Sequence, residues 1–480
     1  MNQVIESLKS GNWRALLACF LYFDTGFTVW VLFGPLAPFI GKDITMSAAE
    51  QGFLVAVPVL SAAILRVTLG NLFQSVNGKP LALMGISLSA IPAVALLLLP
   101  APSYTMLLVL GVFLGVGGAS FAVALPMAGS NYPPKVQGLV LGLAAAGNIG
   151  VTLDGLLFPT LAEKYGWQHA AAAVLPLLAI TAVAMSFWAH DLSKKSPGAR
   201  RAFAAFAVTL AGTIGLVFLI RLGIIGGALT ALFGDSYTRA NTFVSGKIPL
   251  LLLPLLGSML AVAVLPQRYR AVLAERDTWV FMLVYSMTFG GFVGMSSYVP
   301  TLLITQYHVS KIDAGLLMAL FGFTGALIRP VGGYIADKVT GVRALLVLLA
   351  GISLLDFSFA ALMPGFAGGV ALIFCMFVCF GLGNGSTFQL VPQRWKDKTG
   401  IMTGIIGAAG GIGGAYLPVI MGIARDATGS YQASFATFGG LAATALVAVV
   451  LLRTQWLAWA MPVHGEPGAA ELEGAVHAAE

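Results

Sequence analysis

Two distant segments of this 480-residue chain, LRVTLGNLFQSVNG at residues 65–78 and IRPVGGYIADKVTG at residues 328–341, share one pattern at an offset of 263 residues. Each has an arginine at its second position and glycines at matching places further on. The same offset relates GNIG at residues 147–150 to GGIG at residues 410–413. Because the register is kept over two separate motifs, the repeat predicts two equivalent halves with the same orientation.

The composition indicates that both halves lie in a membrane. Hydrophobic residues make up 58% of the chain and charged residues only 9%, whereas about a quarter of the residues in soluble domains are charged. The chain also contains continuous apolar stretches of about 20 residues, the length that a helix needs to cross the bilayer. These features exclude a soluble enzyme, and they exclude an outer-membrane barrel, whose strands are short and alternate in polarity.

The apolar runs predict an all-α polytopic membrane protein with two six-helix halves plus two extra helices, 14 transmembrane helices in all. The expected spans of the first half are 14–40, 49–75, 80–100, 104–132, 136–162 and 169–190. The extra spans are 203–224 and 247–266, and those of the second half are 278–300, 311–337, 342–364, 368–391, 400–424 and 432–453. The expected domains are therefore a first half at 1–190, a linker with the extra helices at 191–275, a second half at 276–455 and a cytoplasmic tail at 456–480.

The basic residues predict the orientation of the chain. Most of the loop lysines and arginines, including the cluster from Lys194 to Arg201, fall on the side that holds both termini. The positive-inside rule therefore predicts that both termini are cytoplasmic. We expect the protein in the inner, or plasma, membrane of the cell. Because these charges are scattered among short loops, they do not indicate a nucleic-acid partner.

The three cysteines give no sign of a metal site or a disulfide framework. Cys19, Cys375 and Cys379 all lie within apolar runs, and no third ligand accompanies the last two. We therefore expect no metal and no cofactor.

The repeated arginines indicate an anion site. Arg66 and Arg329 each follow at least ten largely apolar residues, so neither can easily reach water from its helix. An arginine at such a depth costs about 2.5–3.5 kcal/mol on insertion scales, and it normally faces a cavity. The structural alternative is an arginine bonded to backbone carbonyls, but two at equivalent positions favour function. A guanidinium is a planar fork of donors that suits a small planar oxyanion.

Two glycine-rich stretches, residues 138–155 and 400–414, lie in later helices of each half. They lack the lysine and the preceding strand of a phosphate-binding loop. Glycines at this spacing allow close helix packing, and they also allow backbone to face a ligand. Both interpretations stay open for Gly147, Gly410 and Gly411, whereas Asn148 offers amide donors to an anion without adding charge.

With these motifs the chain resembles the nitrate/nitrite porter family of the major facilitator superfamily. The resemblance rests on the two arginine helices and covers both six-helix halves, although residues 200–275 depart from the common 12-helix pattern. It also rests on VWVLFGPLAPFI (29–40), AAGNIGVTLDGLLFP (145–159), GLGNGSTFQLVP (381–392) and GIIGAAGGIGGAYLP (404–418).

The resemblance implies the substrate and part of its site. It implies that the chain is a carrier of nitrate, nitrite or both and not an enzyme, working by alternating access and as a monomer. It also implies that Arg66 and Arg329 bind the anion, together with Tyr285 and Phe289 in LVYSMTFGGF and Phe121 in GVGGASF. Two phenylalanines also make physical sense, since a flat anion held edge-on leaves two faces to cover.

The mode of coupling stays open at the level of the sequence. Nitrate/nitrite exchange is electroneutral, whereas nitrate entry with two or more protons would use the proton gradient. Asp24, Asp154 and Asp356 are the acids inside apolar runs, and each is either a packing residue or a proton site. We expect exchange, with Asp24 and Asp154 as the candidates for proton coupling. A facilitator carrier for another small anion is a further alternative, while no motif supports an enzyme or a channel.

Overall fold

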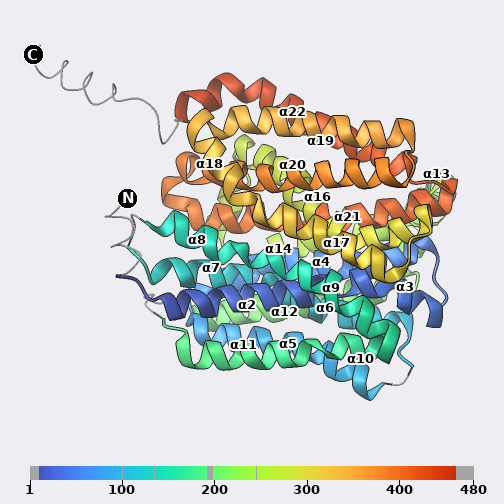
Figure 1. The fold of residues 1–480 in the computed structure, drawn as a ribbon, viewed down its shortest axis with the longest axis horizontal. Helices are drawn as coiled ribbons and strands as arrows, with labels where there is room; N and C mark the ends of the chain where they lie inside the picture. The colour runs from blue at the N-terminus through green and yellow to red at the C-terminus, as the bar shows by residue number, and fades with distance from the viewer. Residues whose placement is uncertain (1–9, 100, 134–135, 192–197, 245, 461–480) are drawn as a thin grey trace, which may run out of the picture.

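A computed structural model describes residues 10–99, 101–133, 136–191, 198–244 and 246–460. Within this part of the chain the fold is helical, and most of the long helices run along nearly the same axis (Figure 1). Lys194 and Lys195 of the expected basic linker lie outside the described residues, as do positions 461–480 of the expected tail.

The first half contains six spans, several of which are interrupted. A single residue separates α2 from α3 and α6 from α7, and the 3-10 turn η2 joins α8 to α9. The segments are α2 (Trp13–Val31), α3 (Phe33–Asp43), α4 (Ala48–Phe73), α5 (Gly78–Leu98), α6 (Tyr104–Ala119), α7 (Phe121–Ser130), α8 (Gln137–Ala145), η2 (Ala146–Ile149), α9 (Gly150–Tyr165), α10 (Trp167–Ala172) and α11 (Val174–Trp188).

The second half repeats this arrangement. One of its spans is interrupted immediately before Arg329, where α17 ends and α18 begins. Its last helix extends to Trp459, past the expected boundary at residue 455. The segments are α16 (Arg276–Tyr307), α17 (Lys311–Leu327), α18 (Arg329–Val339), α19 (Gly341–Leu362), α20 (Phe366–Arg394), η3 (Lys396–Lys398), α21 (Thr399–Thr428) and α22 (Gln432–Trp459).

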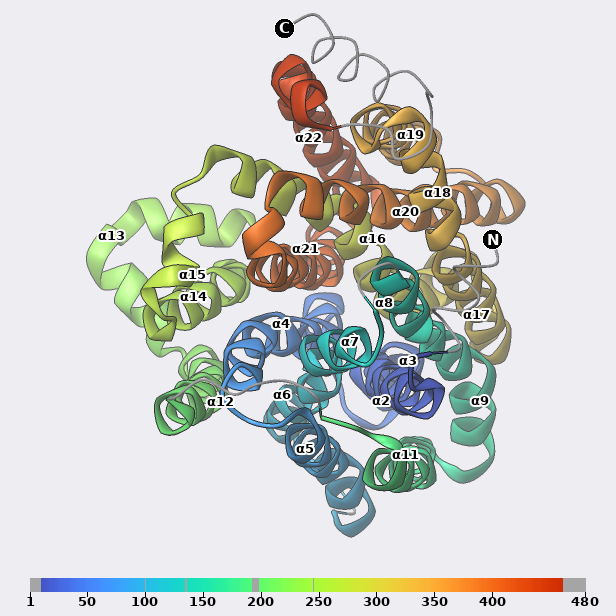
Figure 2. The ribbon, with the colours of Figure 1, turned by 90° about the vertical axis from the view of Figure 1, so that its left-hand side faces the viewer.

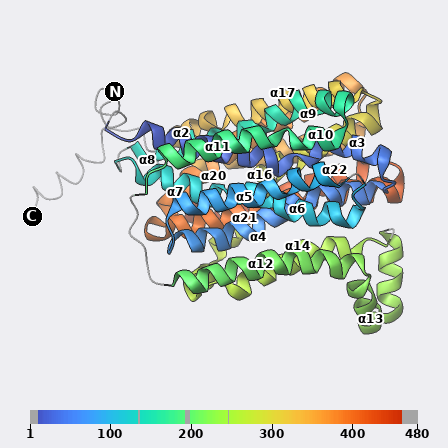
Figure 3. The same cartoon turned by 90° about the horizontal axis from the view of Figure 1, so that it is seen from below.

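In the sequence, four helices separate the two halves. They are α12 (Ala199–Arg221), α13 (Ile224–Phe243), α14 (Ile248–Val264) and α15 (Gln267–Val272). The sequence predicts α12 and α14 but not α13, which runs across their ends (Figure 3). Gly223 precedes α13 and Gly246 follows it, both with positive φ, which allows the sharp turns at either end. The weak, glycine-interrupted apolar pattern of α13 explains why it was missed.

The expected fold class is confirmed. Among the described residues, 13 helices are long and apolar enough to cross a membrane, and the apolar helix Ile248–Val264 is shorter, at 17 residues. This chain is therefore a multi-pass membrane protein. Seen along the helices, the first half and the second half lie side by side, and α12–α15 form a group beside α4 and α21 (Figure 2).

The extra helices contact α4, the helix that carries Arg66, through three polar interactions along its length. Near one end Arg221 forms an ion pair with Glu50 at 3.2 Å. Further along, the hydroxyls of Thr68 and Thr209 are 3.0 Å apart. Near the other end Arg268 donates to the Asn71 side-chain oxygen at 3.2 Å. The extra helices therefore pack on a functional helix of the first half, although they lie outside the repeat.

Local sequence signals set several helix starts. Ser47 and Glu50 form a reciprocal capping box at the start of α4. Asn12 and Ser310 accept hydrogen bonds from backbone N–H groups at the starts of α2 and α17. These caps satisfy donors that have no partner inside the helix.

Glycines bring the two halves into backbone contact. A Cβ built on Gly155 of α9 would lie 2.3 Å from the carbonyl oxygen of Gly315 on α17. A Cβ built on Gly52 of α4 would lie 2.2 Å from the carbonyl oxygen of Pro418 on α21. Close approach of this kind is the main use of small residues between membrane helices.

We predict that Gly155→Ala destabilises the protein, because its new methyl group has to displace backbone rather than a flexible side chain. Overpacking of this kind costs roughly 1–3 kcal/mol. The measurement is the melting temperature of the purified protein in detergent. Gly142→Ala is the matched control from the same glycine-rich stretch, since no atom lies within 4 Å of a Cβ built there. Equal melting temperatures for the two variants would contradict the prediction.

Candidate anion-binding site

Arg66 is buried in the middle of the bundle and bonded to both halves. Its side chain lies on α4, and the residue is 1% exposed. Nη1 donates to the carbonyl oxygen of Gly407 on α21, and Nη2 donates to that of Gly118 on α6, both at 2.9 Å. Its Nε is buried without a partner among the described residues. The guanidinium therefore uses two donors on backbone and keeps a third for another acceptor.

Aromatic rings surround the Arg66 guanidinium. The Cζ atom lies 4.8 Å from the ring centroid of Phe121, 5.4 Å from that of Trp30 and 5.7 Å from that of Phe289. A cation within about 6 Å of a ring centroid is attracted by the negative ring face. These rings stabilise the charge and also exclude water from it.

Arg329 is less completely bonded than Arg66. It opens α18, and its Nη2 donates to the Tyr285 hydroxyl over a long 3.4 Å. Its Nη1 is buried and has no partner within the described part of the chain. The Cζ atom lies 5.6 Å from the ring centroid of Phe388 on α20. Arg329 therefore offers more unused donor capacity to a bound anion than Arg66 does.

A chain of rings connects the two arginines. Tyr285 and Phe289, one turn apart on α16, are stacked with centroids 5.1 Å apart and planes at 4°. Phe289 lies against Arg66, and the Tyr285 hydroxyl accepts from Arg329. The structure thus brings together five residues that the sequence assigns to one site, namely Arg66, Arg329, Tyr285, Phe289 and Phe121.

The three candidate glycines, Gly147, Gly410 and Gly411, differ from one another in their surroundings. A Cβ on Gly410 would lie 2.6 Å from the Tyr285 ring and 2.9 Å from the Phe289 ring, so Gly410 borders the site. A Cβ on Gly411 would lie 2.8 Å from Ala63 of α4, which is helix packing. The nearest atoms to a Cβ on Gly147 belong to α2.

Asn148 lies in η2, beside Gly147. It is buried, and its side-chain oxygen has no partner among the described residues. Since an unpaired buried amide is unfavourable, this oxygen, or the amide nitrogen after a flip, is available to a ligand or a water molecule.

Asp24 and Asp154 lie on the packed helices α2 and α9. Asp154 is 0% exposed, and neither of its carboxylate oxygens has a partner within the described residues. One oxygen of Asp24 is also buried without a partner. The structure therefore places the two candidate proton sites near each other inside the first half.

The sequence did not single out Trp30, Phe388 or the carbonyls of Gly118 and Gly407. One signal was present for Trp30. Phe23, Phe27 and Trp30 on α2 have the same spacing as Tyr285, Phe289 and Phe292 on α16, 262 positions later. These two aromatic stripes meet, since Phe27 contacts Phe292 and Trp30 contacts Phe289 at centroid distances of 6.3 Å.

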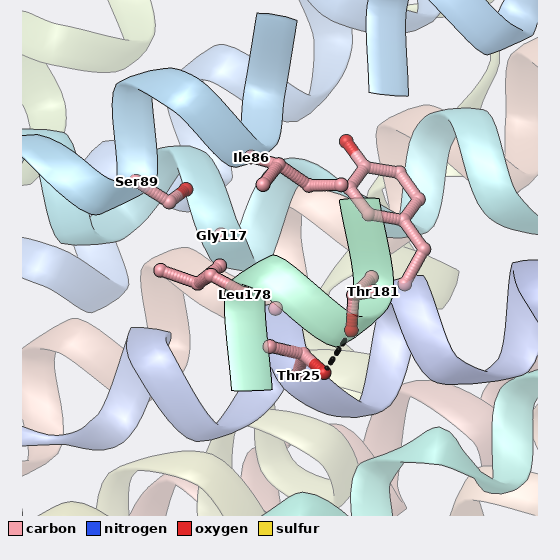
Figure 4. A pocket seen from close by; sticks show the side chains of 8 residues that line it. Thr25, Ile86, Ser89, Gly117, Leu178 and Thr181 are labelled. Carbon is pink, nitrogen blue, oxygen red and sulfur yellow. Dashed lines mark hydrogen bonds between the residues drawn. The ribbon is translucent and has the colours of Figure 1, made fainter. Parts of the chain in front are cut away.

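A narrow cavity lies elsewhere in the first half, between α2, α5, α6 and α11 (Figure 4). Its lining includes Thr25 and Thr181, whose hydroxyls are 2.7 Å apart. None of the candidate site residues lines it, so this cavity is separate from the arginines.

Polar contacts close the bundle at one end, where α3 ends and α4 begins, which we call the far end. The Asp426 carboxylate at the end of α21 accepts from the backbone N–H groups of Ala48 and Ala49, both at 2.9 Å. Lys311 Nζ donates to the carbonyl oxygen of Pro38 at 2.6 Å. Both contacts join the first half to the second.

The sequence of this chain is similar to that of a known family and of several known proteins. Residues 18–418 match the Major Facilitator Superfamily. The probable nitrate/nitrite transporter NarK2 of Mycobacterium tuberculosis is 31% identical over 402 residues, which cover 83% of this chain and 86% of the relative. The nitrite extrusion protein of Bacillus subtilis is 29% identical over 436 residues, 90% of this chain and 91% of the relative. The probable nitrate transporter NarT of Staphylococcus epidermidis is 28% identical over 427 residues, which cover 88% of this chain and 92% of the relative.

We predict that Asp426→Ala opens the far end. The carboxylate acts as a cap on the N-terminus of α4, and loss of such a cap costs roughly 0.5–2 kcal/mol, equivalent to about a 2- to 30-fold change in a population ratio. The measurement is the distance distribution between spin labels at the far ends of α4 and α21, in a background without the native cysteines. A larger fraction of long distances is expected.

The matched control is Asp313→Ala. Asp313 lies at the same end of the bundle, but its carboxylate bonds to Ser310 within its own helix turn. If Asp426→Ala and this control gave the same distances, Asp426 would have no role in closing the far end.

Proposed function

Because this chain belongs to the Major Facilitator Superfamily and, within it, to the nitrate/nitrite porter family, we propose that it carries nitrate and nitrite across the plasma membrane by alternating access. One observation carries the proposal: Arg66 and Arg329, at repeat-equivalent positions of the two halves, are joined through Tyr285 and Phe289. In this superfamily the substrate site lies between the halves.

The unused donors suit a small planar anion. Arg329 Nη1 and Arg66 Nε are buried donors without partners among the described residues. Oxygen atoms of a nitrate or nitrite ion would accept from them in place of lost water. Phe121 and Phe289 lie against Arg66 and would cover the faces of the flat ion. Because these contacts are charge-assisted and desolvated, they are stronger than the same contacts in water.

We propose that the far end is the outer face and that both termini are cytoplasmic. The distribution of basic loop residues supports this orientation through the positive-inside rule. The Asp426 cap and the Lys311 contact would then close the outer entrance. One chain contains both arginines, which supports a monomer as the transporting unit.

The bonds of Arg66 support exchange. Its contact with Gly407 joins α4 of one half to α21 of the other, so it has to break when the halves rotate. Breaking it in the empty protein would leave one buried donor of a charged guanidinium without an acceptor, which costs about 1–3 kcal/mol or more. A bound anion provides a replacement acceptor and also screens the repulsion between the two guanidinium groups. The loaded carrier therefore reorients faster than the empty one.

The membrane potential also requires a coupled partner. Entry of an anion against an inside-negative potential costs about 2.3 kcal/mol per charge per 100 mV. Counter-movement of a nitrite ion for each nitrate ion cancels this cost. Exchange of nitrate for nitrite therefore meets both the structural and the electrical requirement.

Proton symport is the alternative, and Asp154 is the observation that favours it. Asp154 is fully buried, and neither of its carboxylate oxygens has a hydrogen-bond partner among the described residues. A carboxyl group that takes up and releases a proton as the halves move would couple nitrate entry to protons.

Replacing either arginine by lysine tests the site. We predict that Arg66→Lys and Arg329→Lys each reduce nitrate uptake into proteoliposomes by roughly 10- to 100-fold, because lysine keeps the charge but loses the fork of donors. The control is Arg221→Lys in α12, whose side chain pairs with Glu50. Near-normal uptake by both site variants would disprove the assignment of these arginines as the anion clamp.

Counterflow tests the coupling. We predict that labelled nitrate enters liposomes loaded with nitrite or nitrate, and that entry falls at least tenfold when the lumen contains neither anion, since the empty carrier reorients slowly. A second set of liposomes contains neither anion and has an inward proton gradient. Strong accumulation there that disappears in Asp154→Asn would replace exchange by proton symport.

A further inference from the structure

Asn384 on α20 is a buried amide that the site described above does not use. It is 1% exposed, and its side-chain oxygen has no partner among the described residues. We propose that Asn384 is a third hydrogen-bonding group of the anion site, next to Arg329, and that it favours nitrate over nitrite. This inference rests on the proposed function and adds the residue that distinguishes the two anions.

The neighbours of Asn384 define the direction in which its side chain leaves α20. Gly381 and Gly385 face the span that carries Arg329, because Cβ atoms there would lie 2.3 Å from the Gly325 carbonyl oxygen and 2.1 Å from the Arg329 carbonyl oxygen. Gly383 faces α16, because its Cβ would lie 2.5 Å from the Thr288 methyl group. At 100° per residue, position 384 points between these two directions. Asn384 therefore projects into the wedge between α16, α18 and α20.

Phe388 supports this placement. It lies one helical turn after Asn384, on the same face of α20. Its ring meets the edge of Tyr285 with centroids 5.0 Å apart, and it lies 5.6 Å from the Arg329 Cζ atom. The face of α20 that carries Asn384 is therefore the face turned to Tyr285 and Arg329.

The repeat provides an independent argument. Asn384 lies 263 positions after Phe121, the offset that relates Arg66 to Arg329. The Phe121 ring lies 4.8 Å from the Arg66 guanidinium carbon. A pseudo-twofold axis between the halves places the equivalent of Phe121 beside Arg329. At that place this chain has an amide instead of a ring.

Several polar groups in this wedge lack partners. Arg329 Nη1, Thr288 Oγ1 and Asn384 Oδ1 are all buried without a partner among the described residues. Such groups normally bond to protein, water or ligand. The two ends of an amide are nearly indistinguishable, so either its NH₂ group or its oxygen can face a ligand. An acceptor anion between these groups would satisfy Arg329 and the Asn384 amide together.

The shapes of the two anions determine which of them gains from the amide. Nitrate is planar and has three equivalent oxygens, whereas nitrite is bent and has two. Two oxygens suffice for the two guanidinium groups, so a third donor finds a further oxygen only on nitrate. An amide adds this donor without a third positive charge. We therefore expect a larger gain for nitrate than for nitrite, and this gain does not come from added charge.

The experiment compares the two anions in Asn384→Leu, which keeps the approximate volume and removes the amide. Exchange into proteoliposomes gives KM and kcat for nitrate and for nitrite. We expect the KM for nitrate to rise roughly 5- to 20-fold and the KM for nitrite to change less than about 3-fold, as for loss of one hydrogen bond to a charged group. The ratio of the two KM values is therefore the decisive quantity.

Thr387→Val is the matched control. Thr387 is buried on the same helix, and its hydroxyl donates to the Gly383 carbonyl oxygen of its own helix at 2.8 Å. We expect this variant to keep the wild-type ratio of KM values. A second test variant, Asn384→Ala, removes the amide without adding bulk and should reproduce the selective loss for nitrate.

Three outcomes would overturn the inference. These are an unchanged KM ratio in both test variants, an equal rise in KM for both anions, and loss of folded protein in both test variants, which would assign Asn384 a structural role. The wild-type protein distinguishes this failure from that of the proposed function. If it carries neither anion, the proposed function is wrong, whereas if it carries both and only the Asn384 result fails, that function stands.

Discussion

The rest of this structure depends on a charged guanidinium held in the middle of an apolar bundle. Arg66 has no carboxylate partner among the described residues, and backbone carbonyls and aromatic rings stabilise its charge instead. One of those carbonyls belongs to the other half of the protein. The same bond therefore stabilises the buried charge and couples Arg66 to the relative position of the halves.

Glycines and aromatics have complementary roles around this charge. Gly155 and Gly52 let backbones of opposite halves touch, so the halves pack closely without large side chains between them. Gly410 leaves room for the rings of Tyr285 and Phe289, which form the wall between the arginines. Because the rings exclude water and contribute no charge, the guanidinium groups provide the electrostatic attraction for an anion.

The two halves share a fold, but the surroundings of their two arginines differ. Arg66 is surrounded by Phe121 and Trp30 and uses two donors on carbonyls, whereas Arg329 has one long bond to Tyr285 and, by our proposal, the Asn384 amide nearby. A small planar ion bound between them would therefore meet a ring-lined side and a polar side. At the proposed site this asymmetry would orient the ion, although the sequence repeat is symmetric.

The sequence by itself determined the class of the protein, the paired halves and most of the spans, because long apolar runs and a repeat in constant register are local, one-dimensional signals. It also selected Arg66 and Arg329, since a charge in an apolar run is conspicuous, but it missed α13, whose apolar pattern is weak. Only the tertiary structure decided which carbonyls bind Arg66, that Trp30 and Phe388 lie beside the two arginines, and that Gly411 packs on a helix. Those facts depend on which faces of distant helices meet, and neither an aromatic nor a glycine in an apolar helix carries a signal of its neighbours across the bundle.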